Sequence, residues 1–62
     1  MDIIKRILLE SRYIISLNKS INELVPIMNI EEETIYDDIN FKLKKFDTEL
    51  YERVISVLYK KS

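Results

Sequence analysis

A run of acidic side chains around one tyrosine is the part of this sequence with the most evident capacity for chemistry. The run comprises Glu31, Glu32, Glu33 and Asp37, with Tyr36 among them. If the segment is helical, Glu33 and Asp37 are neighbours on one face, because residues four apart face each other on a helix. Carboxylates so placed can hold a divalent cation, accept hydrogen bonds from cytosine amino groups, or bind a basic protein surface.

The residue types that usually accompany carboxylates in catalysis are absent. The chain has no Cys, no His and no Gly. It therefore lacks a thiol nucleophile, an imidazole base, a thiolate zinc site and a glycine-rich phosphate loop. Calcium sites usually add backbone carbonyls from a loop with a sharp glycine turn. We therefore interpret the acidic run as a helix N-terminus that interacts favourably with the helix dipole. We expect no catalytic residue, no metal and no cofactor.

Length and composition predict one small domain, residues 1–62, with a thin core. The 62 residues are 47% hydrophobic, with a net charge of −1. A chain of this size buries only about 60% of its unfolded surface. No apolar run approaches the ~20 residues that cross a membrane, and Met1–Arg6 lacks the apolar stretch of a signal peptide. We expect a cytoplasmic, non-enzymatic protein with no membrane partner.

Apolar residues recurring every three or four positions predict an all-α fold of four helices. The first, third and fourth helices cover about residues 3–17, 32–43 and 48–60, and the second begins at Ser20. Asp2 is a candidate cap at the start of the first helix, and Asn18 a candidate stop, since Asn tolerates the left-handed conformation. The inner face of the first helix is predicted to consist of Ile4, Ile7, Leu8, Ser11, Ile14 and Ile15.

The second and third helices have the pattern of a helix-turn-helix. Ser20–Glu23 is a capping box at the start of the second helix. Pro26 predicts that this helix is short, bent or partly irregular, because proline removes a backbone donor. The two helices are predicted to join at Ile27–Ile30. The third helix should point Ile30, Ile35, Ile39 and Leu43 inward, and present Glu31, Glu32, Glu33, Tyr36 and Asp37 to solvent. Phe46 is expected to pack beneath the start of the fourth helix.

The charges of the chain divide into an acidic centre and basic flanks. Residues 21–41 carry six acids and no base, whereas the rest of the chain carries ten bases and five acids. Such a split favours attraction to an oppositely charged partner, a second copy of the chain included. The basic residues that are candidates for contacts with phosphate are Lys19, Lys42, Lys44 and Lys45.

Several stretches together resemble one known family. They are Arg12–Ile15, Lys19–Ile21, Ile30 with Thr34–Ile39, Phe46–Leu50 and Val54–Leu58. Over residues 5–62 the chain resembles the stage III sporulation protein D family of bacterial helix-turn-helix transcriptional regulators. The resemblance implies a DNA-binding regulator whose third helix enters the major groove.

The chain departs from that family's pattern mainly in charge. Glu31–Glu33 stand where the family carries small polar and basic residues, and Tyr36–Asp37 replaces a more basic pair. Asn29 occupies a turn position usually held by Gly, and Asn can adopt positive φ. Pro26 is unexpected. The sequence ends at Ser62, without the family's basic C-terminal extension.

These observations leave two leading hypotheses. In the first, the protein is a DNA-binding regulator that reads bases with its third helix and holds phosphates with the four lysines. In the second, it is a protein-interaction module or DNA-mimicking inhibitor, whose acidic helix binds a basic groove of a nucleic-acid-handling partner. A third hypothesis is self-assembly through the apolar and tyrosine surface. The candidate DNA- or partner-binding residues are Glu32, Glu33, Tyr36, Asp37 and Asn40. The resemblance places the regulator first.

Overall fold

The computed structural model describes residues 2–60, and every regular element among them is helical. The elements are α1 (Ile3–Leu17), α2 (Ile21–Met28), α3 (Glu32–Asp37), the π-helical turn η1 (Asp38–Leu43), α4 (Lys44–Phe46) and α5 (Thr48–Tyr59). The backbone stays helical at Asp38 and Lys44, so α3, η1 and α4 form one continuous third helix. The predicted all-α fold with four helices is confirmed. Two residues of the stretch that resembles the regulator family, Lys61 and Ser62, lie outside the described residues.

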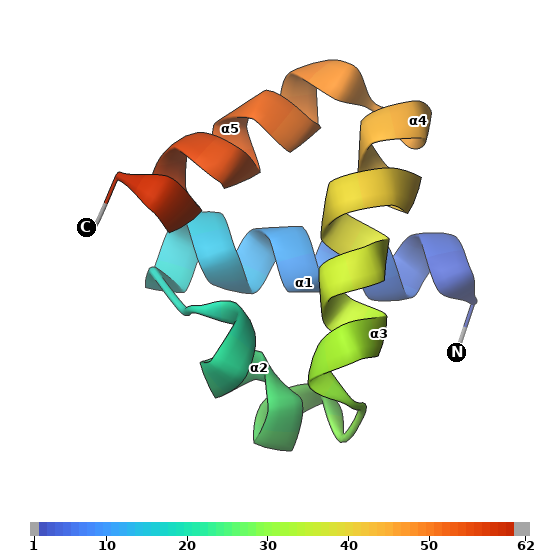
Figure 1. Ribbon diagram of the computed structural model, residues 1–62, viewed down its shortest axis with the longest axis vertical. Coiled ribbons are helices and arrows are strands. Elements are labelled where there is room, and N and C mark those ends of the chain that lie inside the picture. Colours follow the sequence, from blue (N-terminus) through green and yellow to red (C-terminus); the bar gives the residue numbers. More distant parts are fainter. Residues whose placement is uncertain (1, 61–62) are drawn as a thin grey trace.

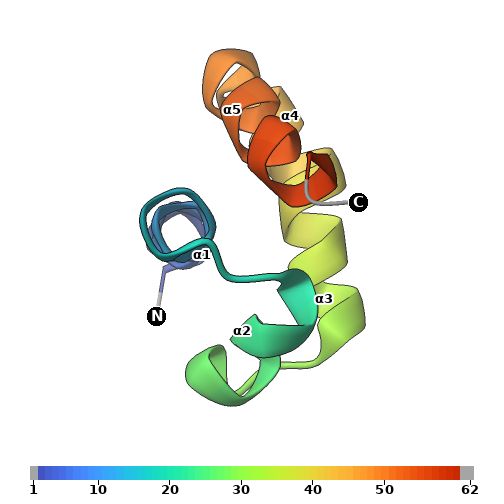
Figure 2. The same cartoon turned by 90° about the vertical axis from the view of Figure 1, so that its left-hand side faces the viewer.

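The four helices surround a single apolar centre. In Figure 1, α1 crosses behind the third helix, α2 lies beside α3 in the lower half, and α5 crosses the top. Figure 2 views α1 nearly end-on, with α2 below it and α5 above it. Accordingly, α1 contacts α5, η1 and α2, while α2 packs against α3. The first helix is therefore the element against which the other three are arranged.

Side-chain caps explain where three of the helices begin. Asp2 accepts a hydrogen bond from the Ile4 N–H at 3.0 Å. The capping box is present, because the Ser20 N–H donates to Glu23 at 2.9 Å and the Glu23 N–H donates to the Ser20 hydroxyl at 3.2 Å. Asp47 caps α5 in the same way, at 3.0 Å. The predicted starts of these helices are thus confirmed by the interactions that fix them.

The core is built from seven branched aliphatic side chains: Ile7, Ile14, Leu24, Ile35, Ile39, Leu43 and Val54. The predicted inner face of the third helix is confirmed for its last three positions, and Ile30 is half-buried. The prediction for the first helix was wrong at two positions, since Ile4 and Leu8 are 37% and 41% exposed. The helix is rotated so that Glu10 is buried instead.

The third helix differs from the expected α-helix ending near residue 43. Its middle, Asp38–Leu43, is π-helical, and the helix continues to Phe46. A π-helix pairs residues five apart and has a wider turn than an α-helix. Phe46 is 49% exposed, so the side chain expected to pack beneath α5 is only about half covered. The helix breaks immediately afterwards because Asp47 is extended, at φ −154° and ψ 92°.

Candidate interaction surface on the third helix

A three-residue connection joins α2 to α3. It consists of Asn29, Ile30 and Glu31, which is later than the predicted junction because α2 continues past Pro26 to Met28. Asn29 is left-handed, at φ 57° and ψ 44°, and its N–H donates to the Val25 carbonyl at 2.9 Å. This conformation ends α2 without a glycine and turns the chain sharply into α3.

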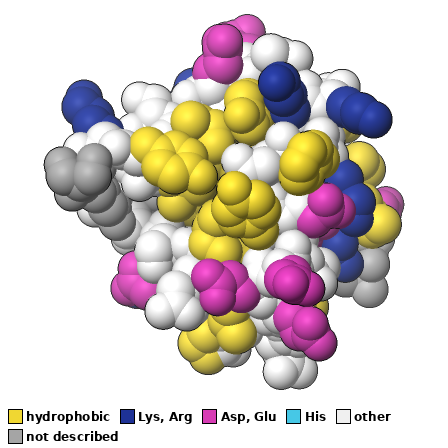
Figure 3. All heavy atoms as spheres, in the orientation of Figure 1, with side chains coloured by type: hydrophobic (Ala, Val, Ile, Leu, Met, Phe, Trp, Pro, Cys, Tyr) yellow, Lys and Arg dark blue, Asp and Glu magenta, His cyan; other side chains and the backbone are white. Residues whose placement is uncertain are grey.

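The turn leaves the outer face of α3 uncovered. All five residues predicted to face solvent are exposed, and Tyr36 is 49% exposed. Four of them line a shallow open depression of about 280 Å³, and we call these four the acidic-aromatic face: Glu32, Glu33, Tyr36 and Asp37. Acidic side chains gather in the lower half of the view in Figure 3. The structure therefore brings together four of the five candidate binding residues.

The fifth candidate, Asn40, lies one turn further along the third helix. Its side-chain amide donates to the Tyr36 carbonyl at 3.0 Å, and the residue is half-buried. The hydrogen bond fixes the amide beside Tyr36, while its carbonyl oxygen keeps acceptor capacity. Asn40 thus borders the acidic-aromatic face but does not line its depression.

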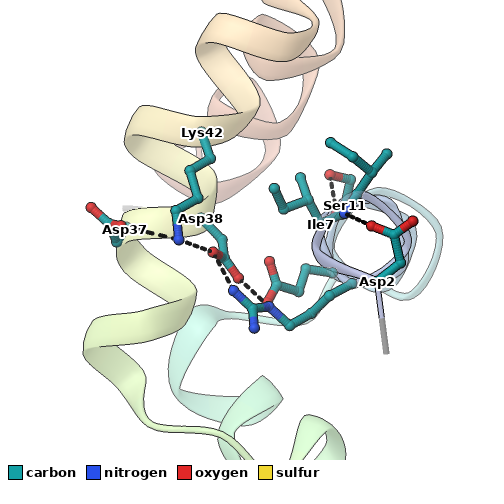
Figure 4. Close-up of polar contacts among 9 residues, drawn as sticks. Asp2, Ile7, Ser11, Asp37, Asp38 and Lys42 are labelled. Carbon is teal, nitrogen blue, oxygen red and sulfur yellow. Dashed lines mark hydrogen bonds and ion pairs between the residues drawn. The ribbon is translucent and has the colours of Figure 1, made fainter.

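Two of the six central acids are compensated by cations of the chain itself. The Arg6 guanidinium binds both carboxylate oxygens of Asp38, at 2.8 Å each. The Lys42 ammonium lies 3.3 Å from Asp38 and 3.5 Å from Asp37 (Figure 4). Lys42 reaches both acids because, in the π-helical turn, residues four and five positions back lie close to it. No ion pair is recorded for Glu31–Glu33 with any other described residue.

The four predicted phosphate-binding lysines have different surroundings. Lys42 is engaged with the two aspartates, and the Lys44 ammonium lies 5.7 Å from the centre of the Tyr51 ring, as a cation–π pair. Lys45 is exposed in α4, whereas Lys19 is half-buried just before α2. None of these lysines is among the residues that line the depression of the acidic-aromatic face.

The first helix supplies a buried cluster that the sequence-based reasoning missed. Asp38 and Glu10 are both fully buried, and Arg6 reaches between them, with its Nε 2.8 Å from Asp38 and 4.0 Å from Glu10. Figure 4 shows Asp38 pointing from the third helix towards α1, with Asp37 on the outer side. Glu10 lies on the same helical stripe as Ile7 and Ile14, and this spacing was the available signal for its burial.

The protonation of this cluster follows from its burial. Burial raises the pKa of Glu10 to about 9, and a hydrogen bond to Asp38 and that residue's negative charge act in the same direction. Burial also acts to raise the pKa of Asp38, but hydrogen bonds from Arg6 and Glu10 outweigh it, so that pKa lies below its usual range. The raised pKa of Glu10 and the lowered pKa of Asp38 thus favour a neutral Glu10 beside an ionised Asp38.

Residues 2–60 lack two other features that would indicate a function. In that range, no three metal-binding side chains come together in a group that could hold an ion. No helix within the same residues has both the length and the apolar character to cross a membrane. Of the sites predicted from the sequence, the acidic-aromatic face is the one whose residues lie together in the structure.

No known family profile, curated protein or solved structure matches this chain significantly.

Proposed function

We propose that the protein is a small helix-turn-helix DNA-binding regulator, with α2 and α3 as the two helices of the motif. The short connection through Asn29 carries this proposal. Helix-turn-helix pairs are joined by a turn of three or four residues, often with Gly, and Asn29 takes the left-handed conformation that Gly would provide. The second helix of such a motif enters the major groove with its N-terminal residues towards the bases. Here those residues are Glu32, Glu33 and Tyr36.

The internal ion pairs reduce the electrostatic objection to DNA binding. The Asp38 side chain points inwards and pairs with Arg6, and Asp37 pairs with Lys42. Neither aspartate therefore presents a full unpaired charge to phosphates. The remaining acids can read bases, because Glu accepts hydrogen bonds from cytosine amino groups. Lys45 is exposed near the end of the same helix and could contact the DNA backbone, as could Lys44 if it leaves the Tyr51 ring. Phosphate contacts of this kind supply most non-specific affinity.

Binding to a mixed-sequence DNA duplex over a salt series tests the proposal. Fluorescence anisotropy should detect binding at about 50 mM salt that weakens steeply towards about 200 mM, as counterion release requires. The double change Glu32→Lys plus Glu33→Lys should strengthen general binding and steepen its salt dependence. The matched control is Glu49→Lys plus Glu52→Lys, which alters two exposed acids of α5 by the same charge. No binding by the unmodified protein, or an equal gain in both variants, would overturn the recognition-helix assignment.

The acidic-aromatic face also supports a second candidate, a module that binds a basic protein groove. Tyr36 is a half-exposed aromatic ring among three acids, and aromatic residues are enriched at protein interfaces. Under this alternative, reversing the charge of Glu32 and Glu33 abolishes capture of a basic partner through like-charge repulsion, while the α5 control retains it. That result, together with absence of DNA binding, would favour the module over the regulator.

A further inference from the structure

In the buried cluster between α1 and η1, one carboxyl group receives no hydrogen bond from a cation. Arg6 uses its Nε and one terminal nitrogen on Asp38, at 2.8 Å each. Its closest recorded approach to Glu10 is 4.0 Å, beyond hydrogen-bond reach. Lys42 is already divided between Asp37 and Asp38. An ionised Glu10 would therefore be a fully buried carboxylate that accepts no hydrogen bond.

A protonated Glu10 removes this conflict. A carboxylic acid carries one O–H donor, and the neighbouring Asp38 carboxylate is an acceptor that is itself fully buried. Charge-assisted hydrogen bonds of this type are short and strong. We propose that Glu10 and Asp38 share a single proton in the folded protein, carried by Glu10, and that this proton latches the third helix to α1. The latch operates whichever partner the third helix binds, so it does not depend on the proposed function.

No other charged group lies where it could stabilise an ionised Glu10 in place of the proton. The groups that act on Glu10 are Arg6 of its own helix and Asp38 and Lys42 of η1. The other helices that pack against α1 present apolar side chains to the core, Leu24 from α2 and Val54 from α5. When the proton leaves to solvent, two carboxylates face each other beside one guanidinium, whose Nε and one terminal nitrogen already bind Asp38. Their repulsion, and the cost of burying the second charge, both push η1 away from α1.

The direction of the pH effect follows from the raised pKa of Glu10. The folded protein holds this proton up to a pH of about 9, whereas the unfolded chain releases it near a pH of ~4.3. The contribution to stability is therefore complete below the unfolded pKa and is lost progressively as pH rises to about 9. Asp38 acts in the opposite sense, because its lowered pKa contributes stability that is lost only in acid.

The composition of the chain makes this titration easy to isolate. With no His and no Cys, no side chain of ordinary pKa titrates between about pH 6 and 8.5. Acetylation of the N-terminus removes the α-amino group, which otherwise titrates in this range. Thermal melts of the acetylated protein, followed by circular dichroism over this interval, should show a Tm that falls steadily with rising pH.

Glu10→Gln tests the assignment, because its amide can donate to Asp38 but cannot ionise. The variant should melt at the same temperature across the interval, while the control Glu52→Gln, at an exposed position of α5, should retain the slope of the unmodified protein. A pH-independent Tm in the unmodified protein, or an equal slope in Glu10→Gln, would overturn the proposal.

Direct titration of the Glu10 carboxyl group tests the shared proton even if the Glu10→Gln variant fails to fold. The side-chain carboxyl carbon of Glu10, followed by NMR in the unmodified protein, should titrate well above neutral pH, and a titration near pH 4 to 5 would refute the shared proton. Amide hydrogen-exchange protection should fall with rising pH in η1 before it falls in α5. Simultaneous loss in both elements would show that the proton stabilises the whole domain and does not latch one helix.

Discussion

The ion pair between Arg6 and Asp38 should be the most costly polar interaction to remove. Arg6→Met keeps the aliphatic length of the side chain but leaves Asp38 fully buried with only Lys42, at 3.3 Å, as a cation. Removing one partner of a buried pair costs about 3–5 kcal/mol. Because the Arg6 side chain is 20% exposed and Lys42 remains, we expect the lower end, about 3 kcal/mol.

This loss is large for so small a domain. At about 0.05–0.15 kcal/mol per residue, the free energy of unfolding of 62 residues is about 3–9 kcal/mol. Arg6→Met should therefore remove between a third and all of it. With an m-value near 1 kcal/mol/M in urea, the midpoint of unfolding should fall by about 3 M, or the variant should be largely unfolded without denaturant.

Urea titration at pH 7, monitored by circular dichroism, measures the effect. Arg53→Met is the matched control, because Arg53 is an exposed arginine of α5, and exposed substitutions usually change stability by about 0.5 kcal/mol or less. Arg6→Lys should fall between the two, since lysine lacks the planar fork that binds both carboxylate oxygens. If Arg6→Met and Arg53→Met shift the midpoint equally, the buried ion pair does not hold the third helix as described.

Three further changes examine the helices that build the site. Ile35→Ala empties a fully buried core position and should lower stability by about 2–5 kcal/mol; a melt within a few degrees of the unmodified protein would contradict its burial. Ser20→Ala removes the capping box and should cost about 1 kcal/mol, measured by urea unfolding, with no loss expected if the cap is dispensable. Asn29→Gly should be nearly neutral, whereas Asn29→Val should be strongly destabilising, because β-branched residues avoid positive φ; equal midpoints for the two variants would refute the left-handed turn.

Local chemistry made much of the fold predictable from the sequence. The capping box at Ser20–Glu23 and the left-handed stop at Asn18 involve residues close together in the chain, and both are present. The inward set of the third helix was also predictable, because Ile35, Ile39 and Leu43 recur at helical spacing and are fully buried.

The buried cluster was not predictable by the same reasoning. Arg6 and Asp38 are 32 positions apart, and only the crossing of α1 behind the third helix brings them together. Glu10 interrupts the apolar stripe of α1. A prediction from apolar residues alone therefore placed the inner face towards Ile4 and Leu8, which are exposed. The π-helical turn likewise has no simple sequence signal, although it allows Lys42 to reach both Asp37 and Asp38.

These long-range contacts change how the acidic charge of the third helix should be evaluated. Six acids with no base between Lys19 and Lys42 indicate strong repulsion of phosphates when charges are counted along the chain. In the folded protein, Asp38 is turned inward to Arg6, and Asp37 is paired with Lys42. The outward charge of the helix is therefore concentrated in its first turn, where carboxylates are stabilised by the helix dipole and where a helix-turn-helix protein reads bases. A test of DNA binding should accordingly alter Glu32 and Glu33 and leave Asp37 and Asp38 intact, because replacing the aspartates also disrupts the contacts that position the helix.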